Sequence, residues 1–194
     1  MIHARTAVAL ATVSLAAALL AGCVPLLIGT AVVGTAAVAT DRRSTGAQLD
    51  DEVIEDKTSL ALLEKYKGSD VHVNVTSYNG IVLLTGEVPT DAVKADVVAI
   101  ARTSPKVRAV QDELVVGPVT SIGRRSDDSL VTSKVKARFV EANKFQINVV
   151  KVVTENGVVY LMGMVTKDEA DTAVELARTT SGAQRVVKIF EYVT

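Results

Sequence analysis

The sequence predicts an α+β fold that consists of two copies of one small unit, each with the order α-β-β-α-β. A segment with Asn-Gly between apolar, β-branched runs occurs twice, at residues 75–88 and 152–165, and the two Asn-Gly pairs lie 77 residues apart. Asn-Gly favours the type I′ turn of a β-hairpin, because both central residues of that turn need φ > 0. A helix-start signal follows each hairpin, and a β-rich stretch ends each unit.

The composition fits a folded protein with no strong charge bias. The chain has 194 residues, of which 48% are hydrophobic and 22% charged, and its formal net charge is −1. Removing the segment before Cys23 also removes Arg5, which leaves 20 basic and 22 acidic residues, or −2. Nucleic-acid binding normally goes with a basic excess, so we expect no nucleic-acid partner. The single cysteine excludes an internal disulfide.

Residues 1–22 are predicted to form a lipoprotein signal peptide. His3 and Arg5 precede an apolar stretch over residues 7–20, which ends in Leu-Ala-Gly-Cys at residues 20–23. These four residues resemble the bacterial lipobox, in which the cysteine is lipidated and becomes the mature N-terminus, so Cys23 is the predicted lipidation site. The alternative is a plain transmembrane anchor with a buried cysteine.

The residue after the lipidated cysteine bears on the localisation. Val24 occupies the position where an Asp favours retention in the inner membrane, by analogy with lipoprotein sorting. We therefore expect a lipid-anchored protein on the periplasmic face of the outer membrane. Residues 23–49 then form the lipidated N-terminus and an apolar tether. Pro25 and the Gly-Thr interruptions favour a tether that lies on or near the membrane surface over a second membrane span.

The remaining elements can be assigned in chain order. Residues 51–66 and 129–142 are predicted helices that precede the two hairpins. The second helix of each unit follows a capping signal, which in the second copy is Thr166 with Glu169 three residues later. Final strands are predicted at residues 107–116 and 183–193. The predicted domains are therefore residues 50–117 and 127–194, and residues 118–126 form the linker. Whether the two domains dock stays open.

The repeated unit resembles the BON domain, on the hairpin glycines Gly86 and Gly163 and the second-helix residues Asp91 and Asp168. This resemblance implies a three-stranded mixed sheet covered by two helices, and a binding rather than a catalytic role. With the lipobox, the whole chain resembles the dual-BON outer-membrane lipoproteins of Gram-negative bacteria. That family is associated with cell division, outer-membrane stress and lipid binding.

The sequence shows no catalytic constellation, so we expect a protein that is not an enzyme and has no cofactor. The mature chain has one histidine, His72, which is more typical of a strand edge than of a general base. Several carboxylates crowd the first helix of the first unit, at residues 50, 51, 52, 55 and 56. Acidic residues in a first helical turn favour the positive end of the helix dipole, so we expect no metal site there.

The two copies differ most in the charge of their first helices. Residues 50–117 carry 7 basic and 12 acidic residues, or −5, whereas residues 124–194 carry 11 basic and 9 acidic residues, or +2. On the helix predicted at residues 129–142, four positions with helical spacing are expected to face the sheet: Val131, Val135, Phe139 and Ala142. The predicted lipid-binding residues come from this helix: Leu130, Lys134, Val135, Lys136 and Arg138.

Basic side chains around an exposed leucine suit the surface of an anionic bilayer. The resemblance implies the same contact, because in that family the first helix of the second BON domain meets phospholipid such as phosphatidylglycerol or cardiolipin. Leu130 stands where the relatives carry a bulkier aromatic residue. A solvated helix face is the alternative for the charges. For the protein, the alternatives are an interaction module whose acidic first unit docks on outer-membrane assembly or peptidoglycan-remodelling proteins, and a structural spacer.

Overall fold

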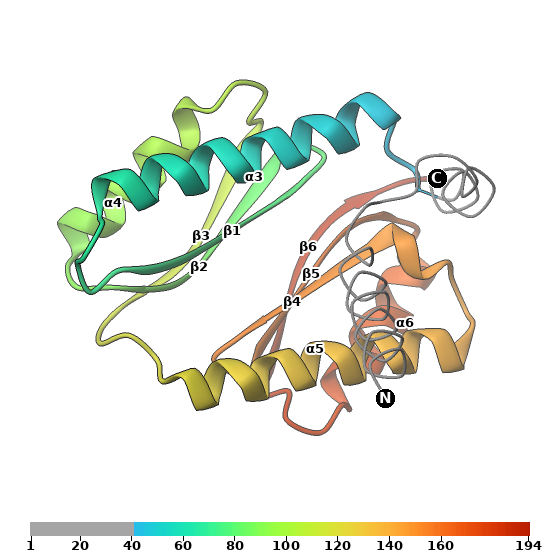
Figure 1. Cartoon of the computed structure of the whole chain (residues 1–194). Coiled ribbons are helices and arrows are strands. Elements are labelled where there is room, and N and C mark those ends of the chain that lie inside the picture. The colour runs from blue at the N-terminus through green and yellow to red at the C-terminus, as the bar shows by residue number, and fades with distance from the viewer. Residues whose placement is uncertain (1–40) are drawn as a thin grey trace, which may run out of the picture. The chain divides into compact units, whose positions relative to one another are not determined.

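The computed structural model describes residues 41–194, which belong to one compact unit. The predicted signal peptide, Cys23 and the tether up to residue 40 lie outside the described residues. The first copy of the repeat contains α3 (Thr45–Lys65), β1 (His72–Tyr78), β2 (Ile81–Val88), α4 (Asp91–Thr103) and β3 (Ala109–Val116) (Figure 1). The second contains α5 (Ile122–Ala142), η2 (Ile147–Val149), β4 (Val150–Glu155), β5 (Val158–Val165), α6 (Lys167–Arg178) and β6 (Arg185–Tyr192).

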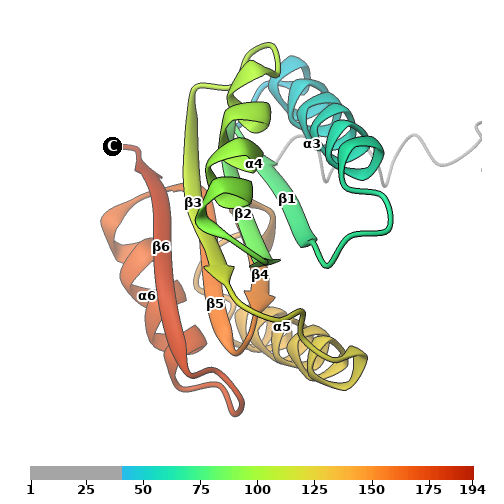
Figure 2. The ribbon, with the colours of Figure 1, turned by 90° about the vertical axis from the view of Figure 1, so that its left-hand side faces the viewer.

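Each copy forms one three-stranded mixed sheet, with the strand orders β1-β2-β3 and β4-β5-β6 (Figure 2). The hairpin strands pair antiparallel, and the last strand of each copy pairs parallel with the middle one. The parallel pairing requires a crossover, and α4 and α6 supply it. The predicted α+β fold and the order of elements are confirmed.

The two Asn-Gly pairs form the predicted hairpin turns. Asn79 and Asn156 both have φ 51°, and each following glycine has φ 75°. Further along β2, Gly86 has φ 113° and lies opposite Val73. A Cβ atom at Gly86 would lie 2.1 Å from the carbonyl oxygen of His72. Only glycine therefore lets the two strands of the first hairpin approach so closely.

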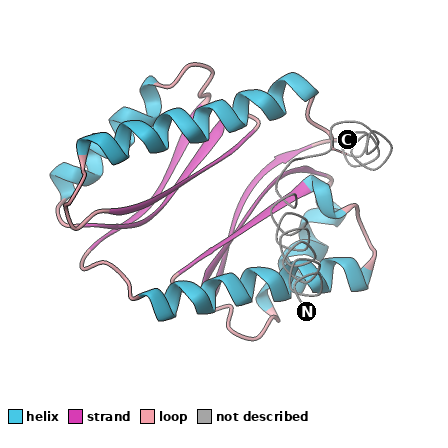
Figure 3. Cartoon of the chain, in the orientation of Figure 1, coloured by secondary structure: helices cyan, strands magenta, loops and turns pink. Residues whose placement is uncertain are grey.

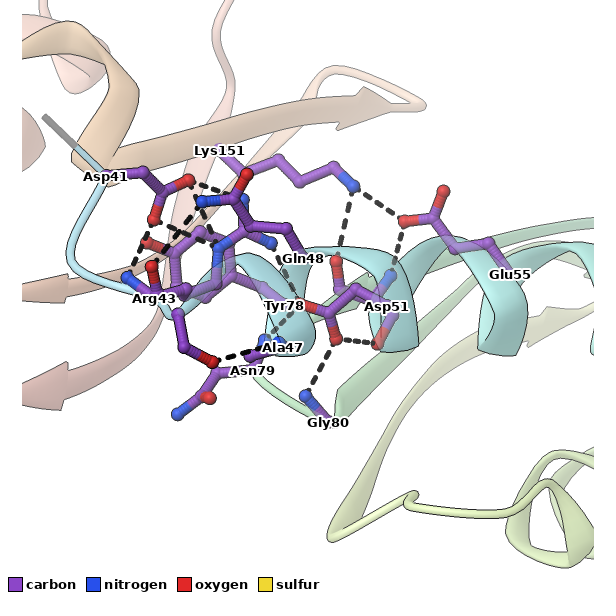
Figure 4. Close-up of polar contacts among 12 residues, drawn as sticks. Asp41, Arg43, Ala47, Gln48, Asp51, Glu55, Tyr78, Asn79, Gly80 and Lys151 are labelled. Carbon is purple, nitrogen blue, oxygen red and sulfur yellow. Dashed lines mark hydrogen bonds and ion pairs between the residues drawn. The ribbon is translucent and has the colours of Figure 1, made fainter. Parts of the chain in front are cut away.

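A buried aspartate on the first helix of each copy holds the hairpin turn. Asp51 accepts hydrogen bonds from the backbone N–H groups of Asn79 and Gly80, at 2.6 and 2.8 Å (Figure 4). Asp128 accepts the equivalent bonds in the second copy, at 2.9 and 2.8 Å from nitrogen to oxygen. These bonds satisfy turn donors that would otherwise be buried without partners. They fix each hairpin to the helix that precedes it.

The first helices begin earlier than the sequence predicted. Helix α3 starts at Thr45 rather than residue 51, and α5 starts at Ile122 rather than residue 129. The caps are Ser44 and Ser121, whose hydroxyl oxygens accept hydrogen bonds from the N–H groups of Ala47 and Arg124. The two serines lie 77 residues apart, so the repeat begins before the acidic pair at residues 50 and 51. Most of the predicted linker, residues 118–126, is therefore helical.

The two copies dock through the open faces of their sheets. One hydrophobic core lies between each sheet and its own two helices, with Val97 in the first copy and Phe139 in the second among the fully buried side chains. A third core lies between the sheets, where Tyr78 and Leu83 of the first copy pack with Tyr160 and Met162 of the second. The helices form the outer layers, and the sheets face each other (Figure 3). The question of docking that composition left open is thereby settled.

Polar contacts surround this inter-domain core. The side-chain amide of Asn79 donates to Glu191 at 2.7 Å, and that of Asn156 donates to Glu87 at 2.5 Å, so each hairpin turn binds a glutamate of the other domain. Lys151 adds an ion pair with Glu55 at 2.6 Å. These bonds fix the register in which one sheet meets the other.

The segment that leads into α3 contacts both domains. Arg43 pairs with Asp41 and Asp51, and its guanidinium lies 4.0 Å above the centre of the Tyr78 ring (Figure 4). Arg42 pairs with Glu169 of the second domain at 2.6 Å. The chain therefore enters the two-domain unit at one fixed place. None of the helices formed by residues 41–194 has the length and apolar character that crossing a membrane requires.

Candidate functional site

Helix α5 presents one face to its sheet and the opposite face to solvent. Val131, Val135 and Phe139 follow each other at intervals of four residues, and all three are buried in the core of the second domain. The helix ends at Asn143, which adopts the left-handed conformation with φ 45°. An asparagine tolerates this conformation at a helix end better than most residues do. The side chains between the buried positions therefore form a continuous outer surface over the whole length of the helix.

Leu130, Lys134 and Lys136 lie on this outer surface. The side chain of Leu130, in the first half of α5, is 58% exposed. Lys134 lies one turn after Leu130 on the same stripe of the helix, and Lys136 lies on another flank. Both lysines are exposed, and among the ion pairs of residues 41–194 neither has an acidic partner. Their charges are therefore available to a ligand without the loss of an existing ion pair.

Two predicted lipid-binding residues have other positions. Val135 is 0% exposed and packs in the core, so it cannot touch a membrane while the domain is folded. Arg138 reaches across to the end of α6, where it donates hydrogen bonds to the carbonyl oxygen of Leu176 at 2.7 Å and to the hydroxyls of Thr179 and Thr180. Carbonyl groups at a helix end lack partners within the helix. Arg138 therefore holds α6 against α5.

The exposed face also contains apolar residues that the sequence reasoning missed. Ile122 is 75% exposed and Val140 is 61% exposed, and both lie on the outer side of α5. Ile122 was assigned to the linker because the start of the helix was placed too late. Together with Leu130 they give the helix three exposed large apolar side chains.

A cavity of about 370 Å³ opens beside this face. Leu130, Lys134 and Arg124 of α5 line it, together with Gly157 and Gln184. Asp127 and Asp128 line it as well, so its two cations are balanced by two carboxylates. The exposed lysines of the helix face, rather than this cavity, therefore provide the positive charge for an anionic ligand.

The outer face of α3 is acidic, whereas that of α5 carries exposed lysines. Its exposed apolar residues are Leu49, Val53, Leu60 and Leu63. Together with the exposed Asp56 they are spaced by four, three, four and three residues, which is the spacing of one coiled-coil seam. The flanking positions include the acidic residues 50, 52 and 64. The crowded carboxylates of this helix serve separate contacts, since Asp50 pairs with Lys106 and Glu55 with Lys151.

A third group of polar side chains lies where the two domains meet. His72, Glu87 and Glu155 each offer one metal-ligating atom, and these atoms all lie within 4.8 Å of one another. His72 begins β1, but its side chain is only 16% exposed and pairs with Glu87. No pattern in the sequence indicates this group, because Glu155 comes from the other copy of the repeat.

The comparisons with known proteins agree with the fold. The sequence pattern of the BON domain matches residues 50–118 and 127–194. The outer membrane lipoprotein DolP of Haemophilus influenzae is 40% identical over 174 residues, which cover 89% of this chain and 90% of that protein. The 21 kDa hemolysin of Actinobacillus pleuropneumoniae is 34% identical over 154 residues, or 79% of each chain. Osmotically-inducible protein Y of Escherichia coli is 28% identical and covers 73% of this chain and 72% of its own. The chain therefore belongs to the BON-domain family, as a lipid-anchored outer membrane lipoprotein with two BON domains.

Proposed function

We propose that this lipoprotein binds anionic phospholipid, such as phosphatidylglycerol or cardiolipin, through the outer face of α5 and thereby supports the integrity of the outer membrane. The observation that carries the proposal is the 58% exposed Leu130, with the exposed Lys134 one helical turn later and the exposed Lys136 on the neighbouring flank of α5. An apolar side chain that inserts among lipid chains, with cations at the level of the phosphates, is the pattern of an interfacial helix. The role is one of binding and not of catalysis.

The size of the interaction follows from these few residues. Each lysine near an anionic surface contributes about 1 kcal/mol, and full burial of a leucine side chain contributes roughly 1.5–3 kcal/mol. Leu130 with two lysines therefore gives about 3–5 kcal/mol, which corresponds to a dissociation constant of about a millimolar. Such a contact is weak in solution. A lipid anchor in the same membrane makes it effective, because the second contact becomes intramolecular.

Flotation with liposomes tests the proposal, and the repeat supplies a matched control. Lys134 of α5 corresponds to Lys57 of α3, 77 residues earlier, and both are exposed. Residues 41–194 should float with vesicles that contain phosphatidylglycerol, float less as salt rises, and fail to float with neutral phosphatidylcholine. Lys134→Glu should weaken the binding by about tenfold or more, whereas Lys57→Glu should leave it unchanged. Arg138 stays unaltered in this test, because it holds the end of α6.

The outcomes separate the explanations. If both charge reversals weaken flotation equally, the attraction depends on net charge and not on α5. If the unaltered protein does not float at low salt with anionic vesicles at lipid concentrations well above about a millimolar, lipid binding through this domain is wrong. Leu130→Ser adds a second test, since it removes the inserted side chain without changing charge. It should weaken flotation at every salt concentration.

The outer face of α3 favours a second candidate function, which is docking on a protein of the envelope-assembly or peptidoglycan-remodelling machinery. Leu49, Val53, Leu60 and Leu63 continue one apolar seam along the helix, with Asp56 in its middle. Two copies of this helix paired antiparallel would bring Asp56 close to its own copy, which disfavours self-association. The fitting partner is an amphipathic helix with basic flanks and a basic residue opposite Asp56.

Site-specific photo-crosslinking in cells tests this candidate. A crosslinker at Leu63 should capture a protein of that machinery, and Leu60→Glu should abolish the product. A crosslinker at Leu130 of α5 should not capture the same protein. A product from Leu63 that survives Leu60→Glu would contradict docking through the seam.

A further inference from the structure

The inter-domain group of His72, Glu87 and Glu155 combines side chains that ligate metals. They come from three different strands, β1, β2 and the end of β4, so the third side chain belongs to the other domain. Their ligating atoms lie within 4.8 Å of one another. Glu87 and Glu155 are 2% and 6% exposed. Two carboxylates and an imidazole that converge in a buried place are uncommon unless something compensates them.

Hydrogen bonds from neighbouring residues fix the orientation of both carboxylates. Glu87 accepts from the Asn156 side chain at 2.5 Å and from the backbone N–H of Thr120 at 3.2 Å. Glu155 accepts from the Asn74 side chain at 2.6 Å. Bonds of this kind hold the ligands of metal sites in place. Each carboxylate is bound by an asparagine of the opposite domain, so the group is set by the docking itself.

The group carries more negative charge than its neighbours compensate. Among the ion pairs of residues 41–194, Glu87 pairs with His72, and Glu155 pairs with no basic side chain. A divalent cation between the two glutamates would remove this imbalance.

A cavity of about 310 Å³ opens onto His72 and Glu155, two of the three side chains of the group. His72, Asn74 and Glu155 line the cavity together with Thr154 and Ser129. Arg125 and Asp128 also lie along it, and their opposite charges offset each other. The cavity provides room for a water ligand and a path for an ion.

We propose that His72, Glu87 and Glu155 bind one divalent transition-metal ion, and that this ion fastens the two BON domains to each other. One nitrogen and two carboxylate oxygens match the ligand preference of Zn²⁺, whereas Mg²⁺ and Ca²⁺ prefer six or more oxygens. In a tetrahedral zinc site with bonds of about 2.0–2.1 Å, ligating atoms lie about 3.4 Å apart. The two ligating atoms that lie farthest apart are within 4.8 Å of each other. They must therefore approach each other by at most about 1.4 Å to bind the ion. A water molecule from the cavity completes the coordination.

The single histidine of residues 41–194 makes the experiment unambiguous. Zinc chloride is titrated into this two-domain unit, and the imidazole resonances of His72 are followed by NMR while calorimetry gives the stoichiometry. We expect saturable binding of one ion per chain, a change of the His72 resonances on the same curve, and a rise in the melting temperature. Magnesium chloride at the same concentration should have no effect.

Variants show which side chains hold the ion. Glu155→Gln keeps an oxygen that accepts from Asn74, and His72→Asn keeps a polar side chain, so both should fold. Each should raise the dissociation constant at least about tenfold. Glu191→Gln is the matched control, because Glu191 is an inter-domain glutamate that binds Asn79 and Arg108 instead. It should bind zinc as the unaltered protein does. If the His72 resonances do not change at saturating zinc, or if all three variants bind zinc equally more weakly, the proposal is wrong.

Discussion

Replacing Asp51 should destabilise the protein more than replacing its counterpart in the second copy. Asp51 accepts bonds from the N–H groups of Asn79 and Gly80 and from the hydroxyl of Ser77, and it also pairs with Arg43. Asp51→Ala removes all four. Asp128 accepts from Asn156 and Gly157 in the same way. Asp128→Ala is therefore a control with the same chemistry, the same place in the fold and fewer bonds.

The magnitudes follow from the number of donors left without a partner. A buried donor that loses its acceptor costs about 1–3 kcal/mol. Two lost turn bonds give about 2 kcal/mol for Asp128→Ala, and the further loss of Ser77 and Arg43 gives about 4 kcal/mol for Asp51→Ala. The second value is a large part of the roughly 5–15 kcal/mol by which a folded domain is stable.

Urea unfolding of residues 41–194, followed by circular dichroism because the chain has no tryptophan, measures both values. The slope of the free energy with urea should be the same for all three proteins, which shows that only stability has changed. Equal losses in the two variants would refute the reasoning, because the additional bonds of Asp51 would then contribute nothing. A loss below about 1 kcal/mol in both would show that the aspartates do not hold the turns.

Three further predictions follow from other contacts. Burial alone would raise the pKa of Asp51, but hydrogen bonds from Ser77, Gly80, Asn79 and Arg43 outweigh it and lower the pKa. The stability that Asp51 provides is thus present above its ordinary pKa of 3.8 and is lost as the pH falls below that value, so the difference between the unaltered protein and Asp51→Ala should shrink in acid urea titrations. Gly86→Ala should cost about 2–4 kcal/mol, because the added Cβ would lie 2.1 Å from the His72 carbonyl oxygen at φ 113°. Gly117→Ala, with no atom within 4 Å of the added Cβ, should change the stability by less than about 1 kcal/mol in the same assay. Met162→Ala, at a side chain with 0% exposure between the sheets, should cost about 2–5 kcal/mol and shift the NMR resonances of Tyr78 in the other domain; unchanged Tyr78 resonances would contradict docking through this core.

The parts of the fold that sequence could predict are those that local geometry decides. Asn79-Gly80 and Asn156-Gly157 need positive φ wherever the chain folds, so the hairpins and the repeat could be found from the sequence alone. The helix starts could not, because Gly46 and Gly123 lie inside the first turns of α3 and α5. Glycine disfavours a helix interior, and these segments therefore resembled linkers. The serine caps at residues 44 and 121 outweigh that preference.

The candidate functional residues were harder to predict than the fold, because their roles depend on contacts between residues that are distant in the sequence. Leu130, Lys134 and Lys136 could be placed on the outer face by helical spacing alone. Arg138 has suitable spacing as well, but the end of α6 binds it, 38 residues further along the chain. The group of His72, Glu87 and Glu155 could not be predicted from either repeat alone, because it forms only when the second copy docks on the first. Helical periodicity shows which side chains share a face, and it does not show which of them another element will occupy.

The four layers, which are helices, sheet, sheet and helices, also give the molecule an asymmetric charge distribution. Because the sheets face each other, α3 and α5 lie on opposite outer sides, and their domains carry −5 and +2 charges over residues 50–117 and 124–194. An anionic bilayer attracts one side and repels the other, so the field of the membrane exerts a torque on the tethered protein. The protein should therefore come to rest with α5 against the lipid and the seam of α3 turned away from it. In that orientation the two outer helices would serve different surfaces of the periplasm at the same time.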